Sequence, residues 1–220
     1  MKKLITQNKL KFLRKKITNY VRIILCVVGY FAFLQQGFAA SPWKSYESDL
    51  SQIELYLNNI KNLSAKFVQE TSDGNIAEGK FFLSRPGKMR IEYETNPKIL
   101  IAVNGAILSY FDVELDEISR LSTNTTPASF LTRPNISFNA KDVEITNVTK
   151  SANQIKVSVM KKNRKEAGEF SLIFATNPLR FSKMEVKNDL EQIISVTLSE
   201  IDFLSPIPDK IFVLKKADNF

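Results

Sequence analysis

The alternation of apolar and polar residues predicts β-strands along most of the chain. In residues 88–95, Met89, Ile91 and Tyr93 alternate with charged residues, which is the period of a strand that buries one face. Turn signals such as Pro86-Gly87 and Asn104-Gly105 separate successive segments and predict neighbouring antiparallel strands. The predicted strands cover residues 63–70, 77–84, 88–95, 99–103, 106–111, 143–149, 154–160, 168–174, 180–187, 192–203 and 211–214. About ten strands in one meander are expected to curl or close on themselves.

Two helices are predicted beside the strands. An apolar stripe at spacings of three and four follows Ser41-Pro42, where proline takes the first helical position. Its members are Trp43, Tyr46, Leu50, Ile53, Leu57 and Ile60. The helix that carries them is expected to pack on the sheet. Thr125-Thr126-Pro127, followed by Phe130 and Leu131, predicts a second, short helix that ends near Arg133.

The first 39 residues have the features of a secretory signal. They contain eight basic residues and no acidic one, with an apolar run at residues 23–34 and the small-x-small site Gly37-Phe38-Ala39. A run of about 12 apolar residues is shorter than the roughly 20 that a membrane span needs. We therefore predict a cleavable leader over residues 1–39, cut near Ala39 and Ala40. The alternative is an uncleaved inner-membrane anchor.

The leader changes how the net charge is interpreted. The whole chain has 31 basic and 23 acidic residues, a net charge of +8, which by itself would suggest an anionic partner such as a nucleic acid. The eight basic residues of the leader account for all of that excess. Residues 40–220 are formally neutral, so we expect no nucleic-acid partner.

Cysteine and histidine usage narrows the chemistry of the exported part. The single cysteine, Cys26, lies inside the predicted leader, and the chain has no histidine. Residues 40–220 therefore have no disulfide, no histidine-based triad and none of the usual histidine metal ligands. We expect no metal and no cofactor. About 180 residues suffice for a single domain with a substantial core.

One arginine stands out in the strand pattern. Arg85 shares a face with the apolar residues Phe81 and Leu83, directly before the turn Pro86-Gly87. A guanidinium has five donors and no acceptor, so in apolar surroundings it must find carbonyl or carboxylate oxygens. The alternative is that Arg85 leaves the sheet at the turn and points to solvent.

Several short motifs occur in an order that resembles a known family. They are Phe67-Val68-Gln69, Gly79-Lys80-Phe81, Arg85-Pro86-Gly87-Lys88-Met89-Arg90-Ile91-Glu92-Tyr93, Pro97, Asn104-Gly105, Leu108, Tyr110-Phe111-Asp112 and Thr126-Pro127. This ordered set resembles the LolA family, periplasmic carriers that shuttle lipoproteins from the inner to the outer membrane of Gram-negative bacteria. The resemblance covers nearly the whole chain after the leader.

The resemblance implies a mainly β fold, an incomplete and strongly curved antiparallel β-barrel of about 10–11 strands. An N-terminal helix and a short helical lid would cover an apolar cavity. It also implies that Arg85 lies at the cavity edge and binds backbone carbonyls of the lid in the empty form. The lid would include the helix that begins at Pro127, with Phe130 and Leu131. The expected cavity or rim residues are Phe81, Leu83, Met89, Ile91 and Tyr93.

The same resemblance implies the partners and the compartment. The cargo would be acylated lipoproteins, loaded by an inner-membrane lipoprotein-releasing ABC transporter and passed to an outer-membrane acceptor. The protein would be a periplasmic monomer that performs no chemical reaction.

The sequence departs from the family pattern at several positions. Met89, Ile91 and Ser109 stand where aromatic residues are common. In Asp189-Leu190-Glu191-Gln192, Glu191 replaces the glycine of the usual Asp-x-x-Gly-Gln. The C-terminus keeps an apolar final segment but lacks the expected Pro-x-Gly-x-x-Val ending.

Other functions remain as alternatives. A LolB-like outer-membrane acceptor would share the architecture, as would a bifunctional protein or a periplasmic lipid-sensing module. A serine hydrolase with lysine as its base is the enzymatic alternative, and Ser64 with Lys66 is the candidate pair, although both lie on a predicted strand. Glu114, Asp116 and Glu117 are expected to form a solvated turn.

Overall fold

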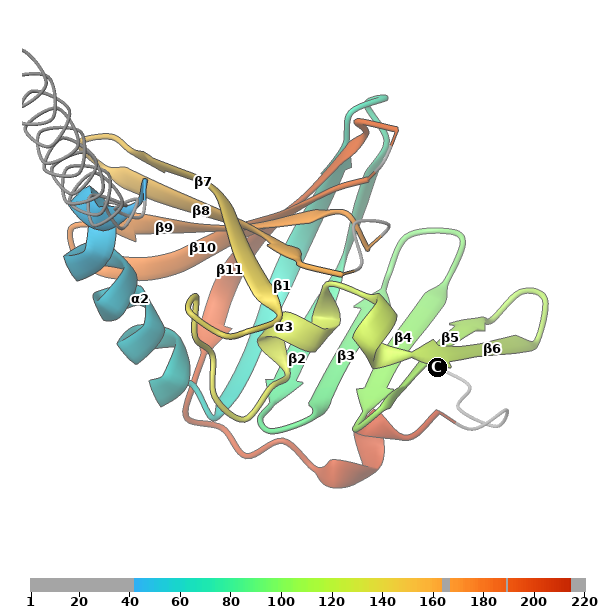
Figure 1. Ribbon diagram of the computed structural model, residues 1–220. Helices are drawn as coiled ribbons and strands as arrows, with labels where there is room; N and C mark the ends of the chain where they lie inside the picture. The colour runs from blue at the N-terminus through green and yellow to red at the C-terminus, as the bar shows by residue number, and fades with distance from the viewer. Residues whose placement is uncertain (1–41, 164–166, 189, 215–220) are drawn as a thin grey trace, which may run out of the picture. The chain divides into compact units, whose positions relative to one another are not determined.

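The computed structural model describes residues 42–163, 167–188 and 190–214 (Figure 1). The chain divides into two compact units, Met1–Lys44 and Ser45–Phe220, and all the strands of the described residues lie in the second. The signal peptide predicted for residues 1–39 lies outside the described residues.

None of the helices within the described ranges has the length and apolarity needed to cross a membrane.

The described residues of the second unit form one 11-stranded antiparallel sheet. Its first six strands are β1 (Asn62–Thr71), β2 (Ile76–Ser84), β3 (Lys88–Tyr93), β4 (Ile99–Asn104), β5 (Ile107–Asp112) and β6 (Glu117–Ser122). The other five are β7 (Val143–Lys150), β8 (Gln154–Lys161), β9 (Glu169–Thr176), β10 (Leu179–Lys187) and β11 (Ile193–Asp202). The predicted mainly β fold is therefore confirmed.

The strand order corrects the expectation of a single meander. The order is β6-β5-β4-β3-β2-β1-β11-β10-β9-β8-β7, so β6 and β7 are the two edges and the sheet does not close. The chain runs outward from β1 to β6, crosses to the opposite edge through residues 123–142, and returns inward until β11 pairs with β1. In Figure 1, strands β7–β10 run across the direction of β1–β4, which shows how strongly the sheet twists.

Strand β6 was missed by the sequence pattern. It begins at Glu117, which was expected in a turn, and only Ile118 among its six residues is even partly buried. An edge strand exposed on both faces lacks the apolar alternation that marks a half-buried strand. Glu114 and Asp116 are exposed in the turn before it, as expected.

Helix α2 (Glu47–Asn59) packs on the inner face of the sheet, the face that carries Phe67, Phe81 and Phe174. It follows the 3₁₀ turn η1 (Lys44–Tyr46) and thus starts later than Ser41-Pro42 suggested. The buried side of the helix carries Leu50, Ile53 and Leu57 from the predicted stripe. Tyr56 meets the ring of Phe174 edge to face at 6.0 Å, and its hydroxyl accepts a hydrogen bond of 3.2 Å from the Phe181 N–H.

The crossing segment contains η2 (Thr123–Thr125) and α3 (Ala128–Leu131). Pro127 precedes the first helical residue and Thr132 follows the last, so the helix is shorter than the one predicted to reach Arg133. Ala128, Phe130 and Leu131 are buried. This segment therefore lies against the sheet as an apolar cover.

The predicted last strand at residues 211–214 is wrong. The chain forms the 3₁₀ helix η4 (Asp209–Phe212), next to β3 and β4 on the outer face of the sheet. Pro208 directly before it has no N–H for a strand ladder. Arg90, which is buried here, donates a hydrogen bond of 2.6 Å to the Ile211 carbonyl.

The next residues complete a small core on that outer face. Leu214 packs with Leu100, Ala102 and Phe111 in one buried cluster. Lys88 and Asp209 form an ion pair at 2.7 Å beside it. The C-terminal segment thus covers the outer face of the strands whose inner face is hollow.

Glu191 shows why the family that this sequence resembles usually has glycine in the β10–β11 turn. Its φ is 62°, in the left-handed region that costs a residue with a Cβ roughly 1–2 kcal/mol. We expect Glu191→Gly to be more stable than Glu191→Ala by about 0.5–1 kcal/mol, because glycine relieves the strain but costs more entropy on folding. Both variants lose the ion pair with Lys187. Urea denaturation measures the difference, and equal stabilities would contradict the strain argument.

Candidate functional site

An apolar cavity lies between the inner face of the sheet and the crossing segment. Its volume is about 260 Å³. Strands from both halves of the sheet and the residues around α3 supply its lining, and nearly all the lining side chains are apolar. They are Phe67, Gln69, Phe81, Met89, Ile91, Tyr93, Ile101, Leu108, Thr126, Pro127, Ala128, Leu131, Phe170, Met184, Val186, Ile194 and Val196.

The structure brings most of the predicted cavity residues together. Phe81 pairs with Ile91 across β2 and β3, and Leu83 pairs with Met89, so these side chains share the inner face. Five predicted residues line the cavity: Phe81, Met89, Ile91, Tyr93 and Leu131. Leu83 is buried on the same face but is not part of the lining.

Sequence reasoning missed the opposite wall of the cavity. Phe170, Met184, Val186, Ile194 and Val196 come from β9, β10 and β11. Each was predicted to lie in a strand, but a strand pattern alone does not show which buried residues border a cavity and which fill the core. The order of strands, which puts β11 beside β1, is what brings this wall to the site.

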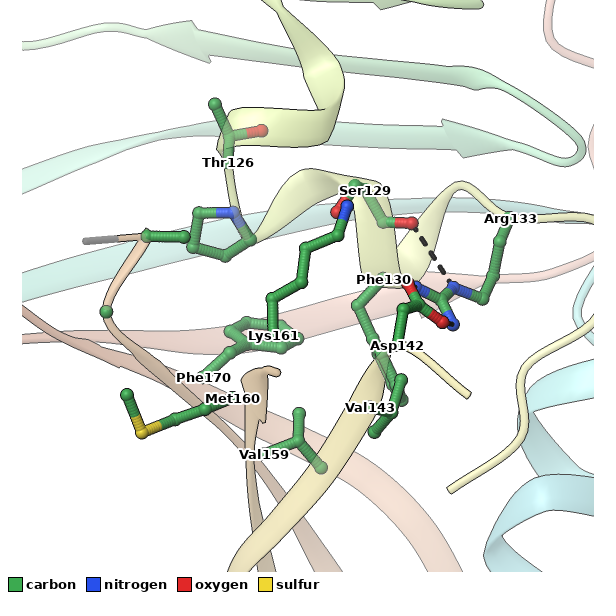
Figure 2. Close-up of a pocket in the computed structure, with 13 residues that line it drawn as sticks. Thr126, Ser129, Phe130, Arg133, Asp142, Val143, Val159, Met160, Lys161 and Phe170 are labelled. Carbon is green, nitrogen blue, oxygen red and sulfur yellow. Dashed lines mark hydrogen bonds and ion pairs between the residues drawn. The ribbon is translucent and has the colours of Figure 1, made fainter. Parts of the chain in front are cut away.

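Phe130 is turned toward a second, much smaller pocket (Figure 2). This pocket, of about 30 Å³, lies between α3 and the β7–β9 side of the sheet and has room for about one water molecule. Phe130 stacks on Phe138 at 5.9 Å and meets Phe170 at 6.1 Å. It thus holds the crossing segment of residues 123–142, called the lid segment from here on, to the sheet instead of lining the large cavity.

Arg133 ties the end of the same segment to the residue before β7. Its guanidinium lies 3.1 Å from an Asp142 carboxylate oxygen and 5.1 Å from the centre of the Phe130 ring (Figure 2). Burial alone would raise the pKa of the Asp142 carboxyl, but the charge and hydrogen bond of Arg133 outweigh it and hold that pKa below its usual value. The pair is therefore charged at neutral pH.

Arg85 connects the lid segment to helix α2. Its Nε and Nη2 donate to the Arg133 carbonyl at 3.1 and 2.9 Å, and Nη1 donates to the Leu57 carbonyl. Nη2 also donates to the Asn58 side-chain oxygen at 3.1 Å. The Leu57 carbonyl lies in the last turn of α2, where carbonyls lack the usual i+4 partner, and it also accepts the Ile60 N–H at 3.2 Å. Every described partner of the guanidinium is an uncharged oxygen, and burial lowers the pKa of Arg85.

Other hydrogen bonds hold the lid segment to the turn after Arg85 and to helix α2. The Gly87 N–H, in the turn after Arg85, donates to the Thr132 carbonyl at 2.7 Å. From α2, Asn58 both donates to and accepts from the Ile136 backbone at 2.8 Å. One turn earlier, Glu54 accepts the Phe138 N–H at 2.5 Å.

Glu54 and Asn58 were missed by sequence reasoning. They are spaced i, i+4 beside the apolar stripe, so one helix face presents both. That spacing was visible, but their partners lie about eighty residues later in the chain. No local signal connects the two segments.

The candidate hydrolase pair lies away from the cavity lining. Lys66 forms an ion pair with Glu200 at 2.9 Å, and its side chain is 59% exposed. Ser64 and Lys66 alternate with Phe67 along β1 and so occupy the opposite face. Among the described residues, no group of three or more histidine, cysteine, aspartate or glutamate side chains could hold a metal ion. The arrangement at the cavity suits binding of an apolar guest.

The inner face of β2 has a gap between side chains at Gly79, which has none of its own. Gly79 pairs with Phe67 on one side and with Tyr93 on the other. The two aromatic rings meet edge to face at 5.3 Å, and the Tyr93 hydroxyl donates to the Gln69 side-chain oxygen at 2.7 Å. Burial, with a smaller effect of Tyr110, raises the pKa of the Tyr93 phenol, so it stays protonated.

Comparison with known proteins identifies relatives of this chain. The outer-membrane lipoprotein carrier protein of Coxiella burnetii is 27% identical over 222 residues, covering 90% of this chain and 96% of that protein. An uncharacterised protein of Rickettsia prowazekii is 25% identical over 186 residues, covering 83% and 85%. The crystal structure of a LolA-superfamily protein of Nitrosomonas europaea aligns with 12% identity and a TM-score of 0.46, covering 75% and 97%.

The family assignment rests on the match between this sequence and a sequence model of a protein family. The model described as "Outer membrane lipoprotein carrier protein LolA" matches residues 58–215, well over half of the chain. That span contains all 11 strands, the lid segment and Arg85. The chain belongs to the LolA family.

Proposed function

We propose that this protein is a periplasmic carrier that binds the acyl chains of lipoproteins released from the inner membrane and delivers them to the outer membrane. The observation that carries the proposal is the apolar cavity of about 260 Å³ beneath the lid segment, which hydrogen bonds hold at its edges. Family membership supports it, because the matching family is described as an outer membrane lipoprotein carrier.

The apolar lining supplies the affinity for an acyl chain. Burying one methylene contributes about 0.8 kcal/mol, so a long acyl chain contributes on the order of 10 kcal/mol. A carrier that offered all of this would hold its cargo as firmly as a membrane does and would not release it. Some of the binding energy must therefore be offset within the protein.

The lid bonds supply that offset in this proposal. The guest prefers the open form, and the net affinity is lowered by the free energy needed to reach it. Arg85 acts as a latch, because its bonds to the carbonyls of Leu57 and Arg133 favour the closed, empty form. The apolar wall binds the cargo, and Arg85 sets how tightly.

The export and transfer steps complete the proposal. The leader over residues 1–39 takes the chain to the periplasm and is removed near Ala39 and Ala40. An inner-membrane lipoprotein-releasing ABC transporter loads the carrier, and an outer-membrane acceptor receives the cargo. The carrier works as a monomer without a cofactor.

Cargo selectivity tests the carrier proposal. Residues 1–220 are expressed in a Gram-negative host, and the soluble protein is mixed with a purified triacylated lipoprotein or with the same protein lacking its acyl chains. We expect only the acylated form to co-elute with the protein on gel filtration, because the acyl chains supply most of the binding energy. Binding of neither form, or equal binding of both, would contradict the proposal. N-terminal sequencing of the recovered protein locates the cleavage site.

A further inference from the structure

Two hydrogen-bonding side chains meet on the largely apolar wall of the cavity. Gln69 on β1 and Tyr93 on β3 both line it, and the Tyr93 hydroxyl donates to the Gln69 side-chain oxygen at 2.7 Å. Thr126 also reaches the lining, but its hydroxyl donates to the Thr123 carbonyl at 2.9 Å. The Gln69–Tyr93 pair is thus the polar point of the wall that retains donors.

The pair has more donors than it uses internally. The glutamine amide carries two N–H groups and the phenol one O–H, and their mutual bond uses one of these three hydrogens whichever way the amide is turned. Among the described residues, no other partner accepts from the Gln69 amide. Two donor hydrogens therefore remain at the cavity.

The small residues of β2 create this arrangement. Gln69 pairs with Ala77 and Tyr93 pairs with Gly79, so the two polar side chains come from strands on either side of β2. Neither Ala77 nor Gly79 has a side chain long enough to stand between them. The Tyr93 ring, held edge to face against Phe67, can therefore extend over β2 to reach Gln69.

A donor in an apolar cavity is costly when a guest covers it without offering an acceptor. Leaving such a group unsatisfied costs about 1–3 kcal/mol. Plain hydrocarbon would incur this cost, whereas an acyl group brings a carbonyl oxygen that accepts the bond. The polar pair thus favours a guest with an oxygen acceptor next to its apolar chain.

We propose that Gln69, oriented by Tyr93, donates a hydrogen bond to the ester or amide carbonyl oxygen of a bound acyl group. This inference rests on the proposed carrier function and deepens it. It makes Gln69 a specificity-determining residue that distinguishes acyl groups from hydrocarbon chains of the same length. Tyr93 is the positioning residue, since its hydroxyl fixes the amide.

The proposal also gives the cargo a direction in the cavity. Gln69 pairs with Ala77 near the start of β2, whereas Arg85 follows the last residue of that strand. At about 3.4 Å per residue in an antiparallel strand, the eight steps from Ala77 to Arg85 span roughly 27 Å. The carbonyl end of the acyl chain therefore lies far from the latch. The protein part of the cargo leaves the cavity near the β1–β2 turn.

The test compares two probes that differ only in the carbonyl. One is a short lipopeptide whose N-terminal S-glyceryl cysteine carries two octanoyl esters, and the other carries two octyl ethers. Both are titrated against the full-length expressed protein by displacement of a fluorescent apolar dye, below their micelle concentrations. We expect the protein to bind the ester about three- to tenfold more tightly, the value of one hydrogen bond.

Three variants test whether the Gln69 amide is the hydrogen-bond donor that causes the preference for the ester. Gln69→Leu should bring the ester-to-ether ratio to about one, and Tyr93→Phe should reduce it in part, because the amide remains but is no longer fixed. Gln154→Leu is the matched control, because Gln154 is an exposed glutamine on β8 outside the cavity lining, and it should keep the wild-type ratio. Circular dichroism confirms that each variant is folded.

The possible outcomes are distinct. A wild-type ratio of one, or a ratio that Gln69→Leu leaves unchanged, would overturn the inference while the carrier proposal stands. Failure of both probes to bind the wild-type protein would overturn the carrier proposal itself, and the inference with it.

Discussion

Replacing Arg85 with leucine is expected to slow the release of bound lipoprotein at least tenfold while the protein still folds. The guanidinium donates to the carbonyls of Leu57 and Arg133 and to the Asn58 side chain, and so joins α2 to the end of the lid segment. Hydrogen bonds from a charged donor contribute about 1.5–3 kcal/mol each. Losing even one of them in the closed form shifts the balance toward the open, loaded form by about tenfold or more.

The release assay follows transfer of a fluorescently labelled triacylated lipoprotein from the carrier to lipid vesicles. Arg120→Leu is the matched control, since Arg120 is an exposed arginine on β6, outside the cavity lining. Arg85→Lys keeps the charge but loses the planar fork that reaches several oxygens, so its release rate should fall between those of the wild type and Arg85→Leu.

Two results would count against the latch. If Arg85→Leu and Arg120→Leu release cargo at the same rate as the wild type, the Arg85 bonds serve the fold alone. If Arg85→Leu releases cargo faster, the bonds stabilise the loaded form instead. Thermal unfolding of each variant without cargo separates a change in release from a loss of structure.

The strand pattern of the sequence predicted most of the sheet, for a clear physical reason. Ten of the 11 described strands contain at least one buried residue, whereas β6 contains none, and short turns join many of them. Strand β6 is exposed on both faces, and the segment at residues 209–212 becomes helical where prolines interrupt the chain. The first exception lacks the alternation that marks a half-buried strand, and in the second the apolar residues after Pro208 were given more weight than the prolines.

The site was predictable in part. Arg85 and the β2–β3 wall stood out because a charged residue in an apolar stripe is unusual, and the family resemblance gave it a role. Asn58 and the wall from β9–β11 did not stand out. Their importance depends on contacts between segments about eighty or more residues apart. The Gln69–Tyr93 pair shows the same dependence, because only the side-chain gap at Gly79 allows it to form.

Gly79→Ala is expected to destabilise the protein strongly, because Gly79 lies on β2 between Phe67 and Tyr93 of the cavity lining. A Cβ at this position would lie 1.9 Å from the Glu92 carbonyl oxygen and 2.8 Å from the Phe67 ring. Flexible side chains can move to relieve such overlap, but the Glu92 oxygen belongs to the backbone of the neighbouring strand. The methyl group must therefore separate β2 from β3. Overpacking typically costs 1–3 kcal/mol, and here we expect about 3 kcal/mol or more.

The matched control is Gly74→Ala in the β1–β2 turn. Its φ is +88° and nothing lies within 4 Å of an added Cβ, so Gly74→Ala has a conformational cost of about 1 kcal/mol and no clash. Urea denaturation should show Gly79→Ala as the far less stable variant. Because the Phe67 and Tyr93 rings meet beside Gly79, this variant should also lose affinity for an apolar dye, whereas Gly74→Ala should keep it. Equal stability losses in the two variants would mean that the sheet absorbs the methyl group, and that the glycine is not what shapes this wall.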